Sequence, residues 1–395
     1  MPGVISGLLG FGRSSAGIFT GADGATWQQA AADVPRFQGP AGRLVVEGAR
    51  TNSIPNPRGE GSNGTTWPTG WGFITAGGLS LAGCTQISTA GRPGVRLRFS
   101  GTPTGTSFSF TCDASGATAA AGQYWAGGAW MAQASGSPAI GCNPRLVPRD
   151  ASNVVLGMGG NNLATGANLT TTPQAVRHIP SGTLPTNTAT LRVFFECSGL
   201  TSGVAADFTL DVLSPQLEQG RTYSSPILPA AGAPAATARA ADVPAYTLSA
   251  ALAARGTLVA TVMLPQAAPG GIDQGIWQLD DGSDNNRIVL RNTAGGSTVQ
   301  ALVVSGGTTV ATLSPGSMVA GTAFRVAVGW SSSGASASLG GSAAVSTASI
   351  ATGLTRLLVG HAATALNRAA FGEVGSLDLH PTRLPDATLQ ALTLN

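Results

Sequence analysis

Short stretches in which apolar and polar residues alternate recur along most of the chain, and this period of two limits the fold more than any other feature. In residues 95–99, apolar side chains alternate with arginines, which predicts one buried and one hydrated face. The same pattern occurs at 108–112, 208–212 and 324–328. Clusters of Gly, Pro, Ser and Asn between such stretches supply tight turns. We therefore expect an all-β protein built from antiparallel β-sandwiches.

The length of 395 residues predicts two or three domains with their own cores. An Ala- and Pro-rich stretch at 229–245 shows no alternation and few bulky residues, so it is predicted to be a linker. We expect a short N-terminal docking arm over 1–52 and a jelly-roll sandwich over 53–228. A second sandwich is expected over 246–395.

Two smaller features complete this plan. The motif Ala-Asp-Val-Pro occurs at 32–35 and again at 241–244, each time with an aromatic residue two positions after the proline, which we interpret as a reused leading segment. Helices are scarce. The best candidate is 385–392, where Pro and Asp suit a first turn and Leu389 and Leu392 share one face.

The charge pattern excludes several kinds of partner. Only 10% of residues are charged, the net charge is +3, and all 21 Lys or Arg positions are Arg without any basic run. Nucleic acid is therefore not an expected partner. The first twelve residues lack the features of a secretory signal, and no segment reaches the ~20 apolar residues of a membrane span. We expect synthesis in a bacterial cytoplasm and release to the outside by cell lysis.

The four cysteines, Cys84, Cys112, Cys142 and Cys197, are too widely spaced for a CxxC zinc or redox motif. Two disulfides would be compatible with the number. Because a protein folded in a bacterial cytosol usually keeps its thiols reduced, we expect free, buried cysteines.

Several segments resemble virion proteins. Residues 30–52 resemble the leading segment of tailed-phage and prophage fibre proteins. Residues 214–227 resemble the closing strand of their carbohydrate-binding-module-like jelly rolls. Residues 256–259, 277–282 and 377–384 resemble concanavalin A-like, laminin-G-type sandwiches found at fibre tips. Head spikes of gene transfer agents are similar in kind.

This resemblance implies a virion surface spike or fibre protein, on head or tail, that attaches to host cell-surface polysaccharide. It also implies capsid, spike-base or tail proteins as partners, and a homo-oligomer. One alternative is a structural adaptor that carries another virion protein. A second is a polysaccharide hydrolase, which needs two carboxylates flanking the bond. Glu47 and Glu218 lie in segments interpreted as framework, and the spacing indicates no other pair, so we expect no enzyme and no catalytic residues.

Four tryptophans are the candidate glycan-binding residues, because an indole can stack on the apolar face of a sugar ring. Trp67 and Trp71 flank a Pro-Thr-Gly turn, which favours exposure. Trp125 and Trp130 lie in a strand-like run, where a place in the core is the stronger alternative.

Acidic residues crowd one predicted hairpin. Asp280, Asp281 and Asp284, with two neighbouring asparagines, offer the oxygen ligands that calcium prefers. The alternative is a plain turn, since Asp, Asn and Gly are also the residues that tight loops need. Calcium is the only cofactor that the sequence suggests.

Overall fold

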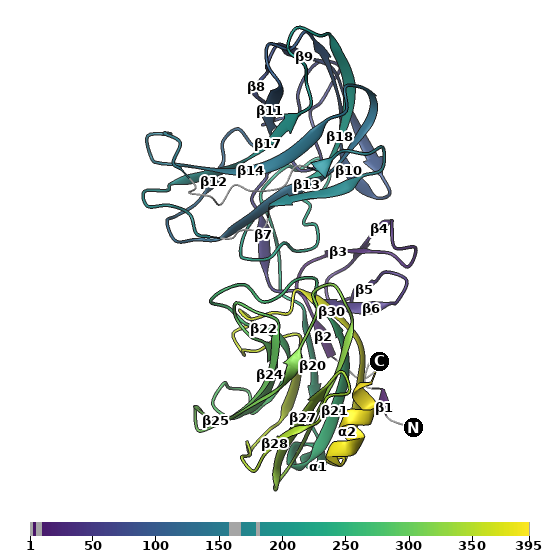
Figure 1. Cartoon of the computed structure of the whole chain (residues 1–395), viewed down its shortest axis with the longest axis vertical. Helices are drawn as coiled ribbons and strands as arrows, with labels where there is room; N and C mark the ends of the chain where they lie inside the picture. The colour runs from purple at the N-terminus through teal and green to yellow at the C-terminus, as the bar shows by residue number, and fades with distance from the viewer. Residues whose placement is uncertain (1–2, 5–9, 158–166, 179–181, 395) are drawn as a thin grey trace. The chain divides into compact units, whose positions relative to one another are not determined.

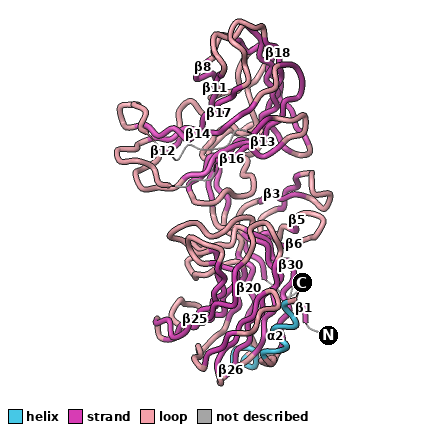
Figure 2. The backbone as a smooth tube through the Cα atoms, viewed as in Figure 1, coloured by secondary structure: helices cyan, strands magenta, loops and turns pink. Residues whose placement is uncertain are grey.

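The structure is a computed structural model that describes residues 3–4, 10–157, 167–178 and 182–394. Strands dominate it, as the magenta segments in Figure 2 show. The chain forms two compact units, and one is inserted into the sequence of the other. The inserted unit is Arg50–Arg239, and the split unit combines Met1–Ala49 with Ala240–Asn395.

The inserted unit is a sandwich of two antiparallel sheets, most of whose strands are labelled in Figure 1. The five-stranded sheet contains, in order, β16 (Gln174–His178), β13 (Trp125–Ser137), β18 (Ala206–Gln219), β10 (Arg92–Gly101) and β9 (Leu79–Thr89). The six-stranded sheet contains β15 (Ala167–Asn168), β14 (Gly141–Arg149), β17 (Thr190–Ser198), β11 (Ser107–Thr111) and β8 (Gly72–Thr75), with β12 (Ala117–Thr118) paired to β17. A short ladder joins β7 (Arg50–Asn52) to β19 (Thr237–Arg239).

The split unit is also a two-sheet sandwich. Its eight-stranded sheet contains β28 (Val345–Thr347), β27 (Gly334–Leu339), β26 (Phe324–Ser331), β21 (Gly256–Met263), β30 (Gly372–His380), β6 (Arg43–Val46) and β5 (Phe37–Gln38), with β1 (Gly3–Val4) paired to β30. Its seven-stranded sheet contains β2 (Gly10–Gly12), β20 (Val243–Thr247), β29 (Arg356–Val359), β22 (Gln274–Asp280), β23 (Arg287–Asn292), β24 (Thr298–Ser305) and β25 (Thr308–Ser317). A separate hairpin pairs β3 (Gly17–Thr20) with β4 (Trp27–Ala30).

Two helices accompany the described part of the split unit. They are α1 (Ala250–Ala254) and α2 (Asp386–Thr393). Helix α2 confirms the predicted C-terminal helix, and its Leu389 is fully buried against Val259 and Ala327 of the eight-stranded sheet. Neither helix is long and apolar enough to cross a membrane, and the described residues contain no other candidate.

These sheets confirm the predicted all-β class with two sandwiches. The alternating stretches became β10, β11, β18 and β26, and in each the apolar side chains point into the core. The domain boundaries differ from the prediction. Strand β2 pairs with β20, and β6 pairs with β30, so these N-terminal strands belong to the sheets of the split unit and not to a separate arm.

The predicted linker 229–245 also differs from the structure. Its last part forms β19, which pairs with β7, and the start of β20. Strands this short carry no alternation that a sequence pattern can reveal, because their stability comes from pairing with residues about two hundred positions away.

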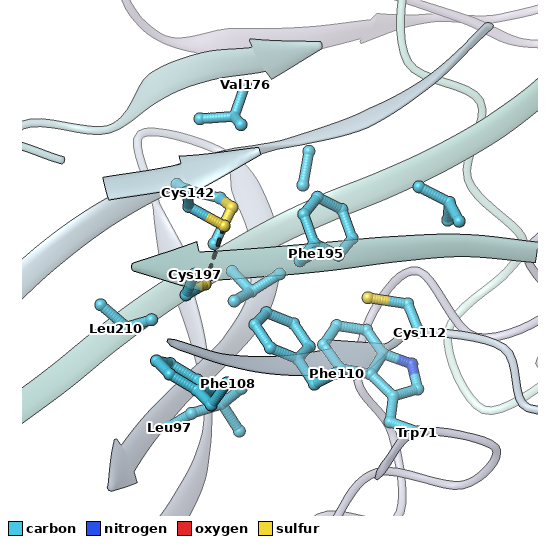
Figure 3. Close-up of a cluster of buried hydrophobic side chains, with 14 of the residues drawn as sticks. Trp71, Leu97, Phe108, Phe110, Cys112, Cys142, Val176, Phe195, Cys197 and Leu210 are labelled. Carbon is cyan, nitrogen blue, oxygen red and sulfur yellow. Dashed lines mark hydrogen bonds between the residues drawn. The ribbon is translucent and has the colours of Figure 1, made fainter. Parts of the chain in front are cut away.

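All four cysteines are buried free thiols, three of them close together in the core of the inserted unit (Figure 3). Cys142 and Cys197 face each other across β14 and β17, and the Cys197 thiol contacts the Cys142 sulfur at 2.9 Å. Burial raises the pKa of the Cys112 and Cys197 thiols well above its ordinary value.

We therefore expect the native protein to resist thiol labelling, because a buried neutral thiol is a poor nucleophile. A maleimide should add to none of the four cysteines at neutral pH, and to all four once the chain is unfolded in denaturant. Intact-mass spectrometry measures the number of adducts. Rapid labelling of the native protein would contradict the buried placement.

Candidate ligand-binding face of the five-stranded sheet

Two of the four predicted glycan-binding tryptophans are core residues. Trp71 is 6% exposed and Trp125 is 4% exposed. The Trp71 indole donates to the Asn56 carbonyl oxygen at 3.1 Å, and the Trp125 indole donates to Gln123 Oε1 at 3.0 Å. Figure 3 shows Trp71 beside Phe110 and Cys112. The predicted role for these two side chains as a stacking surface is therefore wrong, because no sugar ring can reach a buried indole.

Trp67 is partly buried and covers the edge of the same core. Its ring meets Phe73 edge-on, with centroids 5.0 Å apart, and lies 5.9 Å from the Phe99 ring. The turn that separates Trp67 from Trp71 leaves Trp67 half-buried and Trp71 buried. Both tryptophans pack inward against the core that includes the aromatic side chains of β8, β10 and β11, and this packing stabilises the sandwich.

Trp130 is different, because it lies on the outer face of the five-stranded sheet. Its neighbours along β13, Ala129 and Met131, belong to the core, and side chains alternate along a strand. Trp130 is partly exposed, opposite Ala175 of β16 on one side and Leu213 of β18 on the other.

Cationic and aromatic side chains gather around this indole. The Arg92 guanidinium lies 4.3 Å from the Trp130 ring centroid, and the Arg177 guanidinium lies 5.7 Å from it. Arg177 also lies 4.1 Å from the ring centroid of Tyr223. We call Trp130, Arg92, Arg177 and Tyr223 the Trp130 cluster. Within the described chain, Arg177 has no carboxylate partner, and its guanidinium lies against these two ring faces.

The segment after β18 holds Tyr223 in place. Glu218 Oε1 accepts a hydrogen bond from the Ser224 amide at 2.6 Å, and Glu218 Oε2 accepts one from the Ser224 hydroxyl at 2.7 Å. Glu218 is fully buried, and this burial raises its pKa, as it does for the Tyr223 phenol. The interpretation of Glu218 as framework is confirmed, since both of its oxygens are committed to fixing the loop.

The rest of the same sheet face carries paired charges. Arg96 binds Asp211 through two hydrogen bonds of 2.7 and 2.8 Å. Further along, Arg98 Nε donates to Asp207 Oδ1 at 2.9 Å, and this contact with Arg98 lowers the pKa of Asp207. On this face, Arg177 has no carboxylate partner among the described residues, whereas Arg96 and Arg98 are each paired with an aspartate. Such a surface suits a ligand rich in hydroxyl or carboxylate groups.

The predicted calcium residues do not form a metal site. Asp280 binds Arg356 and Gln278, Asp281 binds Ser283 and Asn286, and Asp284 binds Arg287 and the Thr364 amide. No group of three or more His, Cys, Asp or Glu residues that could hold a metal occurs in the described residues. The turn interpretation explains this acidic run, because its carboxylates accept hydrogen bonds from nearby protein donors.

Sequence reasoning named Trp130 but missed its neighbours Arg92, Arg177 and Tyr223. Alternation alone could have placed Trp130 on the outer face, since Met131 next to it is a typical core residue. The arginines come from β10 and β16, which no local pattern links to β13, so only the sheet order brings them together.

No family model and no curated protein matches the chain. Among solved structures, it is similar to the CBM40 module of the Ruminococcus gnavus IT-sialidase bound to α2,3-sialyllactose, with 16% identity, 37% of this chain and 86% of that chain covered, and a TM-score of 0.31. It is also similar to the CBM22 tandem of Paenibacillus barcinonensis Xyn10C, with 10% identity, 84% of this chain and 96% of that chain covered, and a TM-score of 0.28. A third similar structure is domains LG4-5 of mouse laminin α1, with 11% identity, 78% of this chain and 95% of that chain covered, and a TM-score of 0.25. Scores this low identify neither a ligand nor a relative.

Proposed function

We propose that this chain is a non-enzymatic virion surface protein, a spike or fibre component, that attaches to host cell-surface glycans. The observation that carries the glycan part is the Trp130 cluster, a partly exposed indole with two guanidinium groups on an outward sheet face. The virion part rests on the resemblance of the fibre-like segments in the sequence, as do the expected virion partners, the homo-oligomer and release by lysis.

The chemistry of the cluster favours a sugar over other ligands. Guanidinium groups donate hydrogen bonds in a fixed plane to hydroxyl or carboxylate oxygens, while aromatic rings contact the C–H face of a pyranose. With only 10% charged residues, the protein is poorly suited to long-range electrostatic capture. Individual contacts of this kind are weak, so useful attachment would depend on many copies on one particle.

The non-enzymatic part of the proposal is supported by the two glutamates that sequence analysis weighed. Glu47 Oε2 lies 2.8 Å from Arg36 Nη2, and Glu218 is committed to Ser224. They also belong to different units of the chain. A pair of carboxylates flanking one glycosidic bond would have to be provided by other residues.

Replacing Trp130 with Ala tests the site. We expect the affinity of the full-length protein for purified host surface polysaccharide, measured by biolayer interferometry, to fall about tenfold, because roughly 1–2 kcal/mol of stacking is lost. Arg177→Ala should have a similar effect. Arg98→Ala, at the far end of the same face and paired with Asp207, is the matched control and should bind like wild type.

Unchanged affinity in both Trp130→Ala and Arg177→Ala, with thermal unfolding as in wild type, would place the glycan site elsewhere. Absence of wild-type binding to any host polysaccharide would contradict glycan attachment itself. The virion role has its own test. Immunogold electron microscopy of particles, with an antibody against this chain, should label their surface, and unlabelled particles would overturn that part.

A further inference from the structure

A cavity of about 620 Å³ lies at one end of the split unit, between its two sheets. Ile288 of β23 contributes from the seven-stranded sheet, and Trp330 and Ala335 contribute from the eight-stranded sheet. Helix α1 and the loop 349–355 complete the wall. The cavity therefore extends from the surface into the core that both sheets share.

The lining has an apolar floor and a hydroxyl-bearing outer part. Leu248, Ile288, Trp330 and Leu354 are buried members of the core. The exposed lining residues include Ser332, Thr352 and Thr355. None of the residues that line the cavity is ionisable, as far as the structure describes them. A charged ligand would thus lose its hydration without gaining a counter-charge.

The Trp330 side of the wall is held by a hydrogen bond and by close packing. The Trp330 indole donates to the Leu252 carbonyl oxygen at 3.0 Å, which fixes the ring against α1. Gly256 lies so close that a Cβ atom there would come within 2.5 Å of the ring, so the Trp330 ring packs directly against the backbone of β21. The side chains of α1 that face the cavity are alanines, too small to fill it. Interiors normally pack without such space, whereas ligand pockets span roughly 300–1,000 Å³.

We propose that this cavity binds a small neutral molecule with an apolar body and a hydroxyl or carbonyl end. The apolar part would lie against Ile288, Trp330 and Leu354, displacing water from the floor. Its polar end would reach the hydroxyl groups of Ser332, Thr352 and Thr355. This site belongs to the split unit and is independent of the glycan site on the inserted unit.

A fluorescent probe tests the cavity directly. Full-length protein is titrated with N-phenyl-1-naphthylamine, which is neutral and apolar, and we expect saturable enhancement at one probe per chain. Because the cavity has an apolar floor and hydroxyl groups in its outer part, we expect 1-octanol to displace the probe. Octanoate, which has the same chain length but carries a charge, should displace the probe at roughly tenfold higher concentration or more.

Two cavity-filling variants connect the binding to this site. Ala253→Phe, on α1, and Ala351→Phe, in the loop, each place a ring in the space and should weaken probe binding about tenfold or more. Ala387→Phe is the control, because Ala387 is an exposed alanine on the other helix. It should bind the probe as wild type does.

Four results would overturn the proposal. The first is absence of saturable probe binding to wild type, and the second is unchanged binding in both filling variants. Equal displacement by octanoate and 1-octanol would exclude a neutral ligand. Sedimentation velocity tests whether a second copy of this chain occupies the cavity instead. If wild type self-associates and Ala253→Phe is monomeric, a second copy of this chain fills the cavity and the small-molecule site is wrong.

Discussion

Replacing Asp242 with Asn should lower the free energy of unfolding of the split unit by about 3–5 kcal/mol, the cost of breaking a buried ion pair. Asp242 is fully buried. Its carboxylate binds Arg13 Nη1 at 2.9 Å, accepts a second bond from Arg36, and accepts a third from the Glu47 amide at 2.9 Å. The Asp242 carboxylate thus binds two arginines and the backbone directly after β6.

The surroundings of Asp242 explain why the loss should be large. Burial alone would lower the pKa of Arg36, but Glu47 and Asp242 outweigh it and raise the pKa, so this arginine stays charged. An asparagine would take a negative charge away from two buried guanidinium groups. Breaking such a pair costs more than removing both partners, because the remaining charge has no water to replace the lost carboxylate.

Hydrogen–deuterium exchange with mass spectrometry measures this effect in the full chain, because peptides from each unit report its own stability. Peptides from β20, β6 and β30 should lose protection in Asp242→Asn, while peptides from β13 and β18 should not. The control is Asp386→Asn, where a half-exposed carboxylate faces Arg383 at 3.8 Å and should contribute less than about 1 kcal/mol. A loss below about 1 kcal/mol in Asp242→Asn would contradict the predicted role of the network.

The repeated Ala-Asp-Val-Pro motif acquires a physical meaning from this network. Asp33 of the first copy accepts a hydrogen bond from the Arg13 amide at 2.8 Å, and Asp242 of the second copy binds the Arg13 side chain. The two copies therefore converge on one arginine, although the pairing partners lie 229 positions apart. Sequence analysis identified the repeat, but it could not assign this contact, because burial and sheet pairing decide it.

The fold class could be predicted because alternation is local. Each of the recognised strands carries its own apolar face, so β10, β11, β18 and β26 were found without knowledge of their partners. The short strands β2, β5 and β6 carry little such pattern and are set by pairing, which is why the sequence predicts an arm over residues 1–52.

The candidate site was predicted less well, for a related reason. Exposure of Trp67 and Trp71 was inferred from the turn between them, but a turn determines backbone direction and not the direction of the flanking rings. Trp130 was named, yet its two arginines arrive from other strands. Residue types suggested aromatic stacking as the binding chemistry, which stays a prediction, while the tertiary structure determines which indole lies on an outer face.

Trp71→Ala is accordingly expected to act on stability, with a loss of about 3–5 kcal/mol from the free energy of unfolding of the inserted unit. The substitution removes a large ring from the core, leaves a cavity beside Phe110, and removes the indole donor that lies 3.1 Å from the Asn56 carbonyl oxygen, which keeps its bond from the Gly59 amide. Trp71→Phe keeps much of the volume but not the donor, so it should cost less than the alanine variant.

Trp130→Ala is the matched comparison, because it removes the same side chain from the outer face of the same unit. Its loss of stability should stay below about 2 kcal/mol, while its polysaccharide binding falls. Exchange protection of β10 and β11 peptides, measured for all three variants in the full chain, separates the two effects. If Trp71→Ala kept wild-type protection and lost polysaccharide binding, Trp71 would be an exposed ligand contact after all. Its 6% exposure leads us to expect the opposite, since a side chain this buried can affect binding only by loosening the sandwich that supports the face.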